Sequence, residues 1–148
     1  MNHPVFSVPA TPAEAARLLD EPLEALLDSA AALREQHNGK CISLCAIINA
    51  RSGDCGMDCR FCSQSSHNHT PIAHFPFLGA GELRERLLRL AAWPVRRIGI
   101  VTSGGALEEQ ELHCLLAVVR DLPEDVRRRV CTSLGRLPEK HLRELEQA

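Results

Sequence analysis

The sequence predicts an α/β fold in which short parallel strands alternate with covering helices. Three short segments, at residues 41–49, 97–102 and 129–133, contain mostly apolar or β-branched residues, and each is followed by a loop and then by a helical pattern. Parallel strands require a crossover connection, which is usually a helix, so this alternation favours a parallel sheet. Right-handed crossovers place all three strand-to-helix loops at the same, carboxyl edge of the sheet.

A helical segment precedes the first strand. Thr11, Pro12 and Glu14 have the pattern of a capping box, and a Leu-rich stretch with helical spacing then extends to residue 37. Glu21-Pro22 divides this stretch into two helices, because proline cannot donate a backbone hydrogen bond within a helix. Further helices are predicted at 80–92, at 107–121 and from residue 138 onward. We therefore expect an N-terminal helical segment at 1–38 and an α/β domain at 39–148.

Composition and charge disfavour several classes of protein. The chain has 148 residues, 45% of them hydrophobic and 24% charged, which is typical of one globular domain. Seventeen basic and nineteen acidic residues give a net charge of −2, so nothing in the charge balance favours a nucleic-acid partner. No apolar run is long enough to span a bilayer, and the chain opens with no signal pattern, so we expect a cytoplasmic protein without a membrane partner.

Three of the seven cysteines form a metal-binding pattern. In a reducing cytosol, cysteines are metal ligands or catalytic groups more often than disulfides. Cys55, Cys59 and Cys62 have the spacing Cys-x3-Cys-x2-Cys in a long polar segment after the first strand. Thiolates are soft, anionic ligands suited to iron–sulfur clusters or zinc. A cluster held by only three thiolates leaves one iron open for a substrate or cofactor, whereas a structural zinc site is closed by four ligands.

A zinc site is the main alternative for this pattern. His67 and His69 lie near enough in the sequence to complete such a site with the three cysteines. Against zinc, the usual arrangement of two Cys-x2-Cys pairs is missing. Inert buried cysteines are disfavoured as well, because the neighbouring Gly, Asp, Arg and Ser residues make a poor core.

The cysteine motif and its flanks resemble the biotin synthase family of the radical S-adenosylmethionine (SAM) superfamily. The matching stretches are Ile47–Cys55, Cys59–Ser66, Ile100–Gly104 and Val130–Leu137. The resemblance extends from about residue 11 to the C-terminus, and the cysteine stretch is its most specific part. It implies that the three strand–helix units are part of a (β/α)8 TIM-type radical SAM barrel.

The resemblance also implies roles for individual residues. Cys55, Cys59 and Cys62 would bind three irons of a 4Fe–4S cluster, and the fourth iron would bind SAM, whose reductive cleavage releases a 5′-deoxyadenosyl radical. Phe61 would lie near the adenine; its plainer interpretation is packing under the loop. Ser103, Gly104 and Gly105 would present backbone to the methionine part of SAM, and their plainer interpretation is a tight turn. No catalytic residue beyond the cluster ligands is expected.

A second cluster is implied as well. Cys131 matches a ligand of the auxiliary 2Fe–2S cluster that serves as sulfur donor in the family; otherwise it is a small buried residue. Gly99 occupies the position at which many members have another ligand cysteine, so the type and ligands of this cluster remain open.

Four other residues near these motifs have less specific interpretations. Cys41 and Cys45 share one face of the first strand and are expected to be buried there. Arg51 and Arg60 either attract anionic groups near the cluster or are solvated charges.

The implied function is that of a radical SAM sulfurtransferase that converts dethiobiotin to biotin. Its partners would be dethiobiotin as substrate, an electron-donor protein and a second copy in a homodimer. The alternatives are a radical SAM enzyme with another substrate, a small non-enzymatic zinc- or iron–sulfur-binding fragment, and a nonfunctional remnant. A complete (β/α)8 barrel needs roughly 250 residues. With about three β/α units, the chain is expected to be the N-terminal part of such an enzyme, as a truncated product or a partial sequence.

Overall fold

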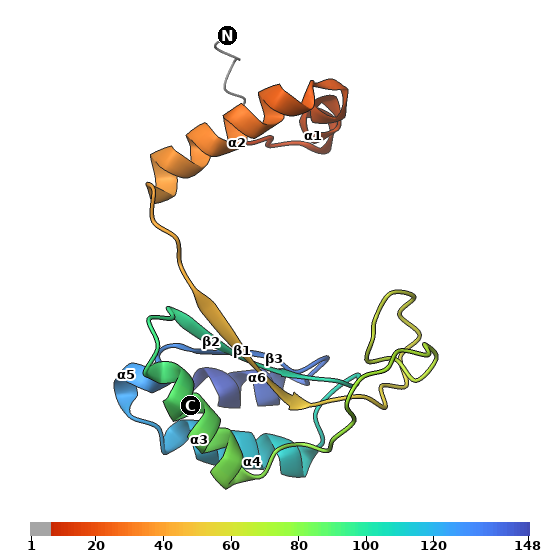
Figure 1. Cartoon of the computed structure of the whole chain (residues 1–148), viewed down its shortest axis with the longest axis vertical. Coiled ribbons are helices and arrows are strands. Elements are labelled where there is room, and N and C mark those ends of the chain that lie inside the picture. The colour runs from red at the N-terminus through yellow and green to blue at the C-terminus, as the bar shows by residue number, and fades with distance from the viewer. Residues whose placement is uncertain (1–6) are drawn as a thin grey trace. The chain divides into compact units, whose positions relative to one another are not determined.

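A computed structural model of the chain describes residues 7–148, which form two compact units (Figure 1). The first unit, up to Ile42, contains helix α1 (Pro12–Arg17), the 3-10 turn η1 (Leu18–Asp20) and helix α2 (Leu23–Asn38). The second unit, Ser43–Ala148, is an α/β unit that contains both the cysteine motif and the glycine-containing turn.

Capping and proline residues define the helices of the first unit as predicted. The Thr11 hydroxyl accepts a hydrogen bond from the Glu14 amide, and the Glu14 carboxylate accepts one from the Thr11 amide, each at 3.2 Å. Glu21 is extended, and Pro22 is the N-cap of α2, so the helical stretch divides at this pair. Among residues 7–148, no helix combines the length and the apolar character needed to cross a bilayer.

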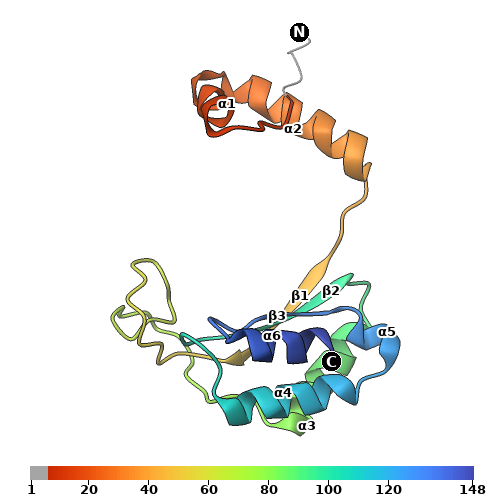
Figure 2. The same cartoon turned by 180° about the vertical axis from the view of Figure 1, so that it is seen from behind.

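The second unit confirms the predicted α/β fold with parallel strands. Its elements in order are β1 (Cys45–Arg51), α3 (Ala80–Ala91), β2 (Arg97–Thr102), α4 (Glu109–Arg120), α5 (Glu124–Arg127), β3 (Val130–Ser133) and α6 (Glu139–Glu146). The strands lie in the order β1-β2-β3, and both neighbouring pairs are parallel. Figures 1 and 2 show the helices of this unit along one face of the sheet.

The core lies between this face and helices α3 and α4. Its largest fully buried side chains are Leu83, Leu87, Ile98, Ile100, Leu112 and Leu115. Side chains alternate across a strand, so Ile48 is buried against the helices whereas the adjacent Ile47 is 68% exposed. Ile47 pairs with Gly99, and Gly99 pairs with Cys131, so these three residues form a row across the helix-free face.

Two predictions about secondary structure were wrong. The first strand begins at Cys45 rather than at residue 41, because its partner β2 begins at Arg97, opposite Cys45. Cys41 therefore lies outside the strand, and both Cys41 and Cys45 are exposed rather than buried. Helix α5 was not predicted, because four residues are too few to establish a helical period.

Candidate metal and cofactor site

The three strand-to-helix loops meet at the carboxyl edge of the sheet. The Ser103 hydroxyl, after β2, donates to the Gly53 carbonyl, after β1, at 2.7 Å. The Arg136 amide, after β3, donates to the Gly105 carbonyl at 2.8 Å. The parallel sheet therefore brings the cysteine motif, the Ser103–Gly105 turn and the segment around residue 135 to one place, as expected for loops that follow parallel strands.

The cysteine motif lies in a closed loop that we call the cysteine loop (residues 53–74). Its ends are joined by two backbone hydrogen bonds between Ser52 and Phe75, at 3.0 and 3.1 Å. Inside the loop, the Cys55 amide donates to the Gln64 carbonyl at 3.0 Å, and the Ser66 amide donates to the Cys55 carbonyl at 2.8 Å. The segment is thus a hydrogen-bonded unit, as long functional loops often are.

Short polar side chains also hold the backbone around the cysteines. The Gln64 amide oxygen accepts from the Gly53 amide at 2.6 Å. The Asn68 side-chain amide donates to the carbonyls of Cys59 and Cys62, at 3.0 and 2.9 Å. These roles were not predicted from the sequence. The available signal was the run of Ser, Gln and Asn after the third cysteine, since such side chains readily bond to local backbone.

The three motif thiols are free and differ in exposure. Cys55 is buried, Cys62 is half-buried and Cys59 is exposed. Within residues 7–148, no three His, Cys, Asp or Glu side chains converge as ligands of one metal ion, and His67 and His69 are both exposed. The donor set fits an iron–sulfur cluster by its chemistry, because all three ligands are soft sulfur atoms on one hydrogen-bonded loop.

Phe61 lies on the outer surface of the cysteine loop. Its side chain is 98% exposed. The interpretation that Phe61 packs under the loop is therefore wrong, because a ring so exposed buries no apolar surface there. The aromatic ring is left accessible next to Cys62.

The second loop, which we call the glycine loop (residues 103–106), lies against the cysteine loop. Gly104 has a φ of 97°, a conformation that side-chain-bearing residues rarely adopt. A Cβ added at Gly105 would lie 3.5 Å from the Met57 sulfur. A Cβ at Gly135 would overlap the Gly105 carbonyl, so the third loop approaches this closely only because residue 135 is glycine.

Arg51 has neither of the roles considered for it from the sequence. Its guanidinium donates to the Ser103 carbonyl at 2.5 and 3.0 Å and to the Ala106 carbonyl at 2.9 Å. It also pairs with the Glu111 carboxylate of α4 at 2.5 Å. The two side chains are only 17% and 16% exposed, so Arg51 is neither a solvated charge nor free to attract an anion. Arg60, in contrast, is exposed.

A cavity of about 560 Å³ lies between these loops. Its lining includes Arg51, Asp54, His74 and Gly104. Asp54 has a φ of 52°, which is uncommon for a residue other than glycine, and its carboxylate lies 3.0 Å from the His74 Nδ1 atom. The cavity is therefore bounded by both the cysteine loop and the glycine loop, and charged side chains form part of its lining.

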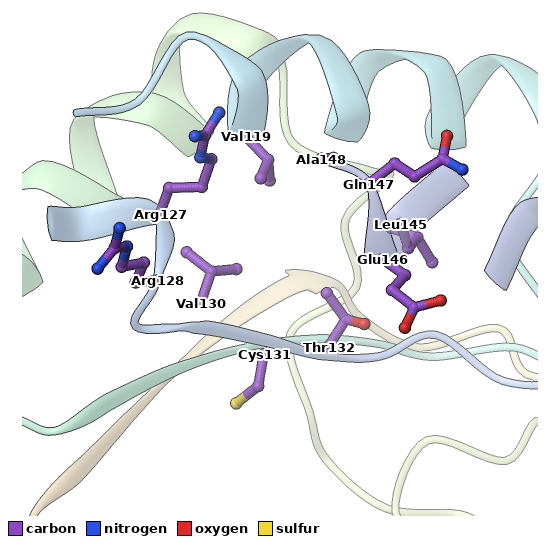
Figure 3. Close-up of a pocket in the computed structure, with 10 residues that line it drawn as sticks. All are labelled: Val119, Arg127, Arg128, Val130, Cys131, Thr132, Leu145, Glu146, Gln147 and Ala148. Carbon is purple, nitrogen blue, oxygen red and sulfur yellow. The ribbon is translucent and has the colours of Figure 1, made fainter. Parts of the chain in front are cut away.

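Cys131 lies apart from the cysteine loop, on β3. A cavity of about 410 Å³ lies at this strand. In Figure 3, Val130 and Thr132 point toward the helices and Cys131 points to the opposite face. Cys131 is exposed, so its interpretation as a small buried residue is wrong. A Cβ added at Gly99 would lie 3.8 Å from the Cys131 sulfur, so residue 99 is an immediate neighbour of this thiol.

Comparisons with known proteins bear out the resemblance seen in the sequence. No family model matches the chain. The chain is 57% identical over 136 residues to a biotin synthase of Desulfovibrio desulfuricans, which covers 92% of the chain and 43% of that protein. It is 42% identical over 122 residues to a biotin synthase of Nitratidesulfovibrio vulgaris, covering 82% of the chain and 34% of that protein. A biotin synthase of Akkermansia muciniphila is 37% identical over 128 residues, covering 86% of the chain and 40% of that protein. Over most of its own length this chain is thus a relative of the biotin synthases, and it spans less than half the length of these curated relatives.

Proposed function

We propose that the chain is the cluster- and SAM-binding part of a biotin synthase, a radical SAM sulfurtransferase that converts dethiobiotin to biotin. One observation carries the proposal: a hydrogen-bonded loop bearing Cys55, Cys59 and Cys62 lies directly against the glycine loop at the carboxyl edge of a parallel sheet. Ligands of α/β folds bind at this edge. The 57% identity to a biotin synthase supports the same function.

In this proposal the cysteine loop binds the cluster, and both loops contribute to binding SAM. Cys55, Cys59 and Cys62 would hold the 4Fe–4S cluster. When bound, the cluster and SAM would supply the one-electron chemistry that is needed to break an unactivated C–H bond. The glycine loop would present its backbone to the methionine part of SAM, because its glycines have no side chain to block close approach. Phe61, whose ring is exposed, would cover the adenine.

Cys131 would contribute to an auxiliary cluster of the 2Fe–2S type on the helix-free face. The support is its exposure on that face, where Gly99 is its neighbour on β2. Gly99 cannot be a ligand, so any further ligands must come from other residues. Dethiobiotin, an electron-donor protein and a homodimer partner belong to the same proposal.

Anaerobic reconstitution of the chain with iron and sulfide tests the cluster site. We expect a brown protein with roughly four irons bound per chain through the motif, and a visible spectrum that shifts when SAM is added. Changing Cys55, Cys59 or Cys62 singly to Ser should abolish most iron binding, because a hydroxyl is a poor substitute for a thiolate ligand. Cys41→Ser is the matched control, since Cys41 is exposed and lies outside the loop.

Three results would contradict the proposal. A colourless protein with one bound zinc would favour the small zinc-binding fragment instead. Iron content that is the same in the three motif variants and in Cys41→Ser would show that the motif thiols do not hold the iron. A brown, SAM-responsive protein would favour a radical SAM enzyme with another substrate if a full-length enzyme that contains this chain does not act on dethiobiotin.

A further inference from the structure

We infer that the Arg51–Glu111 ion pair is a positioning device that sets the backbone of the glycine loop for its ligand. The inference rests on the proposed function, in which that loop faces SAM. It assigns a role to two residues that lie outside the cysteine motif and outside the glycine loop itself.

Arg51 holds the glycine loop at both ends. Its guanidinium donates to the carbonyl of Ser103, the first residue of the loop, and to the carbonyl of Ala106, the last. The planar guanidinium presents several donors in fixed directions, so one side chain can bind two carbonyls at once. The backbone of Gly104 and Gly105 therefore lies between two carbonyl groups that Arg51 holds in place.

Glu111 fixes the position of Arg51. The Glu111 carboxylate oxygen that pairs with Arg51 at 2.5 Å also accepts a hydrogen bond from the Glu108 amide at 2.9 Å. This second bond belongs to the capping box at the start of α4. The ion pair thus connects the end of β1 to the first turn of α4, and the glycine loop lies between these two elements.

The Arg51–Glu111 ion pair is largely shielded from solvent, so its geometry can determine the position of the glycine loop. Both side chains are more than four-fifths covered, whereas the Arg84–Asp121 pair, which connects α3 to the end of α4, is 43% and 68% exposed. Shielded ion pairs are screened less by solvent, and removal of one partner leaves the other charge unpaired. A Cβ at Gly104 would overlap the Arg51 guanidinium, so the loop conformation and the position of Arg51 depend on each other.

The chain contains a matched control at the opposite edge of the sheet. Arg129 donates to the carbonyls of Ala91, Trp93 and Val95, at 2.9, 3.2 and 2.6 Å. It is the same kind of side chain, and it likewise holds loop carbonyls, but in the segment before β2. Loss of Arg129 should lower stability without changing the glycine loop.

The test compares Arg51→Met, Arg51→Lys, Glu111→Gln and Arg129→Met. Hydrogen exchange of peptides that cover residues 103–107, read by mass spectrometry on the metal-free chain, should be about tenfold faster in Arg51→Met. SAM should bind about tenfold more weakly to the iron-loaded variant, at unchanged iron content. Arg51→Lys should recover the charge but only part of the exchange protection, because an ammonium is a point charge without the fork of donors. Arg129→Met should leave both readouts unchanged.

The outcomes separate this inference from the proposed function. Equal loop exchange and equal SAM affinity in Arg51→Met and Arg129→Met would overturn the inference. If Arg51→Met does not fold, the inference is tested with Glu111→Gln, which keeps the side-chain shape. The same two measurements, loop hydrogen exchange and SAM affinity, are then compared. If the wild-type chain takes up iron but binds no SAM, the result contradicts a role of Arg51 in positioning the loop for SAM, but it still supports the cluster site. If the wild-type chain takes up no iron, the result contradicts the proposed function. The comparison of hydrogen exchange between the variants still decides whether Arg51 fixes the conformation of the glycine loop.

Discussion

At the scale of single residues, the candidate site depends on side chains that bond to backbone. A loop without helix or strand has few regular backbone partners, so its amides and carbonyls must be satisfied in other ways. Gln64 and Asn68 satisfy them within the cysteine loop, and Arg51 does so for the glycine loop. These residues thus hold the backbone of the two loops that form the candidate site.

Asn68→Asp should weaken metal retention. The change keeps the shape of the side chain but removes the amide donor to the carbonyls of Cys59 and Cys62, and it places a negative charge beside them. Each lost bond is worth about 1 kcal/mol, so iron should leave several times faster when the reconstituted protein is challenged with a chelator. Asn38→Asp, at the end of α2, is the control; equal rates of iron loss in the two variants would disprove the role of Asn68.

Gly104→Ala should destabilise the α/β unit. Its φ of 97° is unfavourable for alanine, and the new Cβ would overlap the Arg51 guanidinium. We expect a loss of about 1–3 kcal/mol in the free energy of unfolding, measured by urea denaturation. Gly81→Ala is the contrasting change: it lies in α3 with open space around it, and should gain about 0.5–1 kcal/mol. The opposite order of stability would contradict the conformation described for Gly104.

At the scale of elements, the helices determine where the loops lie. The cysteine loop is followed after five residues by α3, which packs with its buried leucines against the sheet, and the glycine loop is followed by α4. The strands supply the other anchor, because β1 and β2 alternate buried residues toward these helices. Each loop is thus held at both ends by a packed element.

Leu83→Ala should cost about 2–5 kcal/mol in the free energy of unfolding, because Leu83 is fully buried in α3 and its loss leaves a cavity. Chemical denaturation followed by circular dichroism measures this change. Leu142→Ala, on α6, is the control; its side chain is 53% exposed, so we expect a change within about 0.5 kcal/mol. A similar cost at both positions would mean that the core does not lie where α3 meets the sheet.

At the scale of the whole molecule, the described chain consists of two units that meet at Ile42 and Ser43. Residues 41–44 are in no helix or strand, and all four are exposed. In the α/β unit, β1 and β3 are the outer strands of a three-stranded sheet. The curated relatives are more than twice as long as the matched stretch, so the proposed activity refers to a protein larger than this chain.

Limited trypsin digestion should cut early after Lys40. Lys40 is exposed and lies between the end of α2 and the start of β1, where little packing protects the backbone. Mass spectrometry should detect a fragment of residues 41–148 that accumulates and keeps its circular dichroism signal. Lys40→Gln should remove this fragment. First cleavage inside the α/β unit, with no accumulation of the fragment, would show that the two units are not separable.

Much of the architecture was predictable because it is encoded locally. The capping box at Thr11, the break at Glu21-Pro22 and the alternation of strands with helices all follow from residues close together in the chain. The spacing of Cys55, Cys59 and Cys62 is likewise a local property, and it led to the family resemblance that the comparisons bear out. The start of β1 was mispredicted because a strand extends only as far as its partner does.

Contacts between distant residues required the folded chain. Arg51 and Glu111 are 60 positions apart, and no spacing rule connects an arginine at the end of one strand to a glutamate in the helix after the next strand. The approach of Gly135 to Gly105 and the exposure of Cys131 on the helix-free face are of the same kind. Residue order thus predicted the candidate ligands and the sequence of elements, because short-range preferences decide these. Three-dimensional packing alone decided which side chains hold the loops in place, because hydrogen bonds and ion pairs form between whichever groups the sheet brings to its edge.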